Sequence, residues 1–202
     1  MQRSRKFFGL PLAVPLAPAP ALGLPMLFAF HAAVLGAAIA WQSLLPGGAA
    51  ALLREPRTMS LPWWAAAIGV SWILVLGPAL LETHVPALQE LGRELYHSVA
   101  PITGLRVAAF AGLAGICEEA LFRGPVQATL GWPLAALLFG LLHGGFAKRL
   151  RVWTMFALAA GGLFGILVEV YDSLSPAIVA HITVNAINMR RLARHAPRKG
   201  PF

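Results

Sequence analysis

Two adjacent carboxylates stand inside an apolar stretch of the sequence, and they are the side chains best placed to do chemistry. Glu118 and Glu119 lie in the run CEEALFR, and residues 107–116 before it carry no charge. The whole chain has only eight acidic residues. A carboxylate at the centre of a membrane costs about 2.5–3.5 kcal/mol on insertion scales, so we expect a chain that carries two of them to use them.

Other polar side chains in apolar segments could complete a hydrolytic site with these carboxylates. A carboxylate and a histidine such as His143 can share a water and deprotonate it. A second histidine and an amide can donate hydrogen bonds to the oxyanion of a tetrahedral intermediate. His181 and Asn185 are four residues apart and therefore share one face of a helix. These residue types suit the addition of water to a peptide carbonyl, so the sequence predicts an intramembrane hydrolase.

The two glutamates cannot have the same role. Adjacent residues differ by about 100° around a helix, so Glu118 and Glu119 cannot face the same point. Glu119 and Arg123 are four residues apart, in the favourable order for an ion pair. We therefore expect one carboxylate to face a cavity while the other is held by Arg123.

The composition indicates the class of protein that must position these groups. The chain has 202 residues, of which 58% are hydrophobic and 12% charged, and its mean hydropathy is +0.70. A soluble domain of this length could not bury so much apolar surface, which indicates an integral membrane protein. The net charge of +8 comes from basic residues beside apolar segments, which argues for membrane flanks and against nucleic-acid binding. A single cysteine excludes an internal disulfide.

Apolar periodicity predicts an all-α, polytopic membrane protein with about six transmembrane helices and one amphipathic interfacial helix. The amphipathic helix is expected over 82–100. The spans are expected at 24–45, at 61–81, from about 101, up to about 146, at 152–171 and from 175. The predicted organisation is a basic, proline-rich lead-in (1–23), two spans with the connector (24–100), a catalytic four-helix core (101–194) and a basic tail (195–202).

Basic residues predict the orientation of these spans. An even number of spans places both termini on one side, together with the basic clusters at 3–6, 148–151 and 190–199. The positive-inside rule makes that side cytoplasmic, with Arg54 and Arg57 as exceptions on the opposite face. We expect a cytoplasmic membrane of the bacterial type.

Depth in the membrane decides whether the polar groups can meet. If the helix that carries Glu118 ended at Gly124, His143 would lie too far along the next helix to reach Glu118. If it continues past Pro125 and turns at 131–133, Glu118 lies about 18 Å before the turn and His143 about 15 Å after it. The sequence therefore predicts a long helix that is kinked at Pro125, with no loop at 123–126.

Three motifs in this order resemble those of the CPBP family, the CAAX proteases and bacteriocin-processing enzymes, also called Abi. The family's E-E-x-x-x-R appears at 118–123 as EEALFR, its F-x-x-x-H at 139–143 as FGLLH, and its H-x-x-x-N at 181–185 as HITVN. The resemblance covers about 104–188. At 171–172 the sequence has Tyr-Asp, where the family commonly has threonine-glycine.

The resemblance implies a glutamate-dependent intramembrane endopeptidase that uses no metal or other cofactor. Glu118 would be the general base, and His143 would orient or share the water. His181 and Asn185 would stabilise the oxyanion. Supporting residues would be Glu119 and Arg123. Substrates in such a family are membrane-associated proteins or peptides, among them C-terminally lipidated tails, leader peptides and sorting-signal proteins, reached among membrane lipids.

Other functions fit parts of the same pattern. One glutamate and two histidines can form a catalytic zinc set, although no His-Glu-x-x-His motif is present. Cys117 could act as a nucleophile, but a buried cysteine more often packs as a small hydrophobe. A scaffold or immunity protein would bind its partner without cleaving it. Intramembrane glutamate and histidine also serve proton or solute pathways.

Several residues near the motifs have simpler interpretations. His31, in the first predicted span, is expected to be packed or hydrogen-bonded between helices. Glu169 lies near the end of a span and is expected to be an interfacial carboxylate. Phe122 and Phe139 lie one turn from motif residues and are expected to pack beside the site.

Overall fold

A computed structural model describes residues 23–53 and 61–196 of the chain. Within these ranges every regular element is a helix, which confirms the all-α prediction. Three predicted features fall wholly or partly outside the described residues: the lead-in up to residue 22, the loop with Arg54 and Arg57, and the tail from residue 197.

The long helices of the described residues follow the predicted segments closely. They are α1 (Leu24–Gln42), α2 (Leu61–Leu81), α3 (Pro86–Val99), α4 (Gly104–Leu121), α6 (Trp132–Gly144), α7 (Arg151–Tyr171) and α8 (Ser175–Leu192). Shorter helical segments are η1 (Ala49–Leu53), η2 (Phe122–Val126), α5 (Gln127–Leu130), η3 (Lys148–Leu150) and η4 (Ala193–His195).

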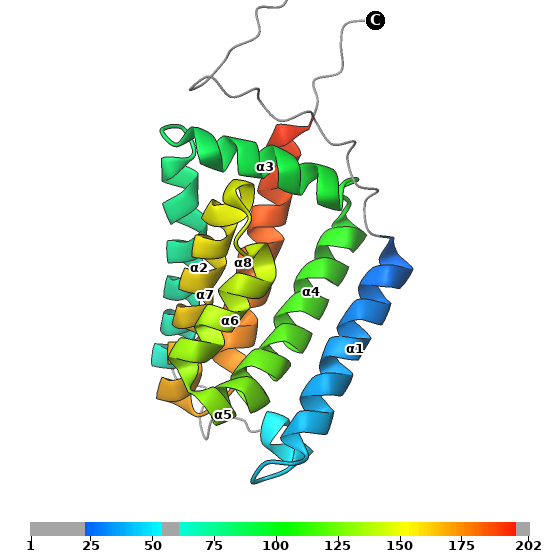
Figure 1. The fold of residues 1–202 in the computed structure, drawn as a ribbon. Helices are drawn as coiled ribbons and strands as arrows, with labels where there is room; N and C mark the ends of the chain where they lie inside the picture. Colours follow the sequence, from blue (N-terminus) through cyan, green and yellow to red (C-terminus); the bar gives the residue numbers. More distant parts are fainter. Residues whose placement is uncertain (1–22, 54–60, 197–202) are drawn as a thin grey trace, which may run out of the picture.

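The connector between the second and third predicted spans is an amphipathic helix, as its periodicity predicts. In α3, Leu91 is buried, while Glu90 and Arg93 are exposed and form an ion pair with 2.7 Å between Nη1 and Oε2. Figure 1 shows α3 lying across one end of a bundle in which α1, α2, α4, α6, α7 and α8 run along a common direction. This position suits a helix with one apolar and one polar face.

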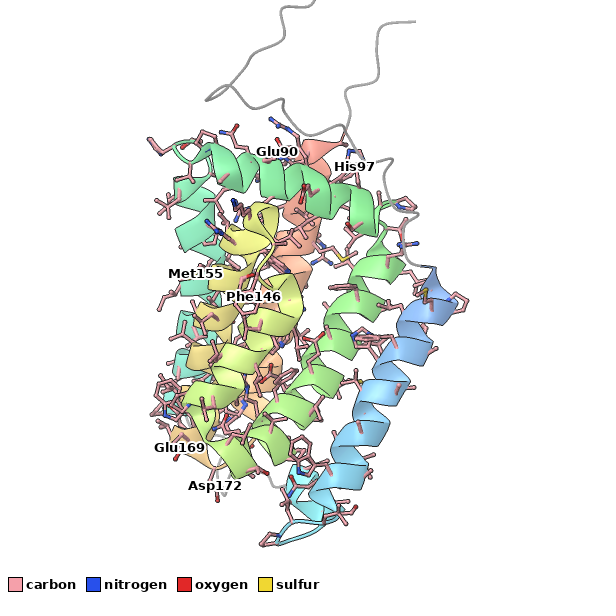
Figure 2. All side chains as sticks on the ribbon, viewed as in Figure 1. Glu90, His97, Phe146, Met155, Glu169 and Asp172 are labelled. Carbon is pink, nitrogen blue, oxygen red and sulfur yellow. The ribbon has the colours of Figure 1, made fainter. Side chains whose placement is uncertain are left out.

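Basic residues gather at the end of the bundle that α3 covers. The connection from α6 to α7 and the C-terminal end of α8 both reach this end (Figure 1). They carry Lys148, Arg151, Arg190, Arg191 and Arg194. Glu169 and Asp172 lie at the opposite end (Figure 2).

Six transmembrane spans are not confirmed. Among the described residues, α1, α2 and α7 are long and apolar enough to cross a membrane, and α3 with 104–130 adds a bent pair at an angle of 102°. The shorter α6 has 13 residues, or about 20 Å at 1.5 Å per residue, against about 30 Å of hydrocarbon. In α4 and α8, the polar residues of the motifs lower the hydropathy. The structure therefore supports three to four spans by length and composition.

The chain continues as a helix through Pro125, which confirms the prediction of a kinked helix. A π-helical turn, η2, joins α4 to α5, and Gly124 within it departs from helical geometry with φ −75° and ψ −112°. Proline has no N–H to donate to the preceding turn, and π-helical turns are one way in which a helix absorbs such a break. Thr129 Oγ1 donates to the Pro125 carbonyl at 2.7 Å. The turn to α6 follows at Gly131, which has a positive φ of 78°.

Small residues allow α6 and α7 to approach closely. A Cβ on Gly140 would lie 3.0–3.1 Å from backbone and Cβ atoms of Leu158, and one on Gly161 would lie 3.2 Å from the Ala136 Cα. Close approach of helices through small residues is common in membrane proteins. It places the face of α6 that carries His143 against α7 and next to α4.

Candidate active site

Glu118 lies on α4 between two histidines that come from different helices. Its Oε2 is 3.6 Å from Nε2 of His143 on α6, and its Oε1 is 3.7 Å from Nε2 of His31 on α1. The side chain of Glu118 is 16% exposed and that of His143 is 23% exposed, whereas His31 is 3% exposed. The structure therefore brings Glu118 and His143 together, as the depth argument predicts.

Both histidines are held in the same way by their own helices. His143 Nδ1 lies 2.8 Å from the carbonyl oxygen of Phe139, and His31 Nδ1 lies 2.9 Å from that of Leu27. A carbonyl only accepts, so each Nδ1 carries the hydrogen and donates it. The tautomer of a histidine is set by the bond that its other nitrogen makes. When the ring is neutral, each Nε2 is therefore an acceptor that faces Glu118.

Glu119 points in a different direction and forms a buried three-residue network. Its Oε2 accepts from Arg123 Nε at 3.0 Å, and its Oε1 lies 2.7 Å from Nδ1 of His181 on α8. The side chains of Glu119 and Arg123 are both fully buried. The predicted pair of Glu119 with Arg123 is confirmed, and His181 adds a contact that the sequence did not indicate.

Aromatic rings fix the orientation of these polar groups. The His181 ring stacks on Phe164 with 5.0 Å between centroids and an angle of 21°. Phe139 packs edge-on against Phe122, and the guanidinium carbon of Arg123 lies 5.4 Å from the centre of its ring. Phe122 and Phe139 are buried beside the site, which confirms their predicted packing role.

The remaining predicted residues lie around this centre without joining it. Asn185 follows His181 by one turn of α8, is half-buried and makes no side-chain hydrogen bond within the described residues. Cys117 is buried at 4% exposure, as expected of a packed thiol. Glu169 is exposed near the end of α7, and its Oε2 accepts from Gln127 Nε2 at 3.4 Å, in keeping with an interfacial carboxylate.

His31 is the site residue whose partner the sequence did not reveal. It is buried between helices, as predicted, but its neighbour Glu118 is 87 residues away in the chain (118 − 31). The available signal was an ionisable side chain inside an apolar span, which marks a functional position in a membrane protein. Its depth relative to Glu118 could not be compared without knowing how α1 packs on α4.

Within the described residues, no three or more His, Cys, Asp or Glu side chains form a group that could hold a metal ion. The ligands of zinc converge on one point at about 2.0–2.3 Å. Here the two imidazoles that face Glu118 approach different oxygens of the carboxylate.

A cavity lies close to the His143 side of the site. Its volume is about 110 Å³, and it is lined by residues of α3, α7 and α8, among them Leu91, Trp153, Phe156 and Asn188. The ring of Trp153 also contacts the ring of His143, with 5.8 Å between centroids. Trp153 therefore touches both the cavity and the histidine ring.

The fold and the site define a helical protein with apolar spans and a glutamate–histidine centre among its helices. A family model described as type II CAAX prenyl endopeptidase Rce1-like matches residues 100–187, so this part of the chain is similar to that family. The match confirms the resemblance to CAAX proteases. Neither a curated protein nor a solved structure matches the chain. The family is one of proteases with membrane-associated protein substrates, and together with the apolar helices it indicates an integral membrane protein.

Proposed function

We propose that the protein is an intramembrane endopeptidase in which Glu118 activates a water that hydrolyses a peptide bond of a membrane-associated protein or peptide. The pair of Glu118 and His143 carries this proposal. Oε2 of Glu118 and Nε2 of His143 lie 3.6 Å apart and are both acceptors when His143 is neutral. One water can donate a hydrogen to each of them, which leaves its lone pairs free to attack a carbonyl.

The water, the substrate and Glu118 supply every atom and proton that the reaction needs. The water oxygen forms a bond to the carbonyl carbon of the substrate, and one water proton moves to Oε2 of Glu118. The tetrahedral intermediate carries an oxyanion. When the carbon–nitrogen bond breaks, Glu118 gives its proton to the leaving amine and returns to the carboxylate. Proton transfer of this kind by a positioned side chain contributes about 10²–10⁴-fold to a rate.

His181 is suited to oxyanion stabilisation only in its cationic form. Nδ1 of His181 is bonded to the Glu119 carboxylate, which accepts, so Nδ1 carries a hydrogen. Nε2 can donate to an oxyanion at the same time only if it also carries a hydrogen, and the ring is then cationic. The Glu119 carboxylate lies between the Arg123 guanidinium and the His181 ring and bonds to both. A preorganised donor of this kind is worth about 10²–10³-fold where an oxyanion forms. Asn185, one turn further along α8, would supply a second donor.

The cavity beside Trp153 indicates the class of substrate. The cavity is mainly apolar, although Glu82, Arg191 and His195 also line it. It suits an apolar group attached to a substrate near its polar end, such as the lipid of a C-terminally lipidated tail. Leader peptides and sorting-signal proteins are the other substrate types.

We place the basic end of the bundle, with both termini, on the cytoplasmic side of a bacterial-type membrane, because Lys148, Arg190 and Arg191 lie at that end.

Cleavage by the purified protein in proteoliposomes tests the proposal. The probe is a farnesylated peptide with a C-terminal CAAX sequence, compared with its unprenylated form. Glu118→Ala and His143→Ala should each lower the cleavage rate at least about 100-fold. Glu90→Ala and His97→Ala are matched controls, because both residues are exposed on α3 at the end of the bundle (Figure 2). Cleavage that survives both site substitutions would reject the proposal.

A comparison of protein termini in membranes tests the same proposal without a chosen substrate. Membranes that contain the wild-type protein should hold new N- or C-termini that are missing with Glu118→Ala. A scaffold or immunity protein would change the abundance of a partner in both membranes and create no new terminus.

A further inference from the structure

Helix α1 contributes a narrow buried stripe to the bundle and contacts α4 most extensively. Its buried residues are Leu27, His31, Ala38 and Gln42, which follow the spacing of one helical face. This helix lies outside residues 100–187, the part of the chain that matches the protease family. The part that matches the family therefore does not contain every side chain that reaches Glu118.

His31 is the polar group of this stripe that faces the proposed base. Its Nε2 lies 3.7 Å from Oε1 of Glu118, the oxygen that does not face His143. Nε2 is buried and makes no hydrogen bond within the described residues, while Nδ1 is held by the Leu27 carbonyl. The ring is therefore fixed in one orientation, with its second nitrogen directed at the carboxylate.

Two facing acceptors require a hydrogen between them. With Nδ1–H used by Leu27, a neutral His31 presents a lone pair to a carboxylate oxygen that also carries lone pairs, and this arrangement is repulsive. A hydrogen on Nε2 turns the contact into an ion pair at 3.7 Å. A small closer approach of the two side chains makes it a charge-assisted hydrogen bond, which is among the stronger interactions of a buried carboxylate. It also offsets the cost of holding a carboxylate out of water.

We propose that His31 is a positioning residue that donates from Nε2 to Oε1 of Glu118 and so directs Oε2 towards His143 and the attacking water. This inference rests on the proposed function of Glu118 as the general base. It assigns different roles to the two carboxylate oxygens: Oε1 is the anchored oxygen and Oε2 is the reacting one. Helix α1 is then part of the catalytic unit, because it supplies the anchor.

A pair of amide substitutions separates a donor at Nε2 from simple packing. The amide nitrogen of glutamine lies at about the same distance from Cα as Nε2 of histidine, whereas that of asparagine lies at about the distance of Nδ1. His31→Gln keeps a donor near Oε1, and His31→Asn does not. Leu35→Ala is the packing control, because Leu35 follows His31 by one turn of α1 and is half-buried.

The experiment measures kcat and KM for the farnesylated CAAX peptide in proteoliposomes. His31→Asn and His31→Ala should lower kcat at least about tenfold and leave KM within about twofold, because a displaced base slows the chemical step. His31→Gln should recover most of that loss, and Leu35→Ala should keep the wild-type kcat. Equal rates for the glutamine and asparagine variants, or a loss in His31→Ala that Leu35→Ala reproduces, would overturn the inference.

Thermal unfolding tests the contact independently of cleavage. The shift in melting temperature of the double variant His31→Ala/Glu118→Gln should differ by about 2 °C or more from the sum of the shifts of the two single variants. Residues in direct contact show such coupling. Additive shifts would overturn the placement of His31 against Glu118. A wild-type protein that cleaves no peptide but shows the coupling would instead count against the proposed function.

Discussion

Removal of the Glu119 carboxylate is expected to destabilise the protein more than any change to an exposed ion pair. Glu119 is fully buried and is bonded to both Arg123 and His181, at 3.0 and 2.7 Å. Its substitution by alanine leaves the Arg123 guanidinium buried and unpaired, since Nη1 and Nη2 already lack hydrogen-bond partners within the described residues. Breaking a buried pair in this way costs about 3–5 kcal/mol. For a protein of this length, each kcal/mol lowers the melting temperature by about 2–4 °C, so we expect a decrease of about 6–20 °C.

Intrinsic tryptophan fluorescence during heating of the detergent-solubilised protein measures this decrease. The matched control is Glu90→Ala, because Glu90 also pairs with an arginine on its own helix but is 66% exposed. An exposed pair contributes about 0–1 kcal/mol, so the control should melt within about 4 °C of the wild type. If Glu119→Ala melted as close to the wild type as the control does, the network would not be the structural element described above.

Three further predictions follow from contacts of single residues. Gly140→Ala should lower the free energy of unfolding by about 1–3 kcal/mol, because its Cβ would meet the Leu158 backbone. The control Gly112→Ala has open space around its Cβ and should not destabilise α4. Equal melting temperatures of the two variants would contradict the close packing of α6 on α7. Treatment with a metal chelator should leave cleavage unchanged, because the two imidazoles approach different oxygens of Glu118; a loss that added Zn²⁺ restores would establish a zinc site. Cys117→Ser should keep the wild-type cleavage rate, because the thiol lies about 100° from Glu118 around the helix; complete inactivity of a folded variant would point to a cysteine nucleophile.

Local spacing and depth were enough to predict much of the site. The separation of Glu119 from Arg123 by four residues predicts their ion pair on any helix. The meeting of Glu118 with His143 follows from counting residues on either side of one turn, because two helices joined by a short turn are antiparallel neighbours. That count required the helix to continue through Pro125, and the π-helical turn at 122–126 provides the continuity.

Contacts between helices that are distant in the chain could not be predicted in the same way. His31 reaches Glu118, and His181 reaches Glu119, through the rotation of α1 and α8 about their own axes. Neither rotation is fixed by a short turn to α4. The number of spans was also hard to predict, because the polar residues that build the site reduce the hydropathy of α4 and α8.

The rate of peptide cleavage by Glu118→Gln tests the central claim most directly. Glutamine keeps the shape of the side chain and its ability to hydrogen-bond, but it cannot accept the proton of the attacking water. With the farnesylated CAAX peptide in proteoliposomes, and with a melting temperature that shows the variant to be folded, a glutamate base predicts a loss of at least about 100-fold in kcat. A folded Glu118→Gln protein that cleaves the peptide within about twofold of the wild-type rate would contradict it.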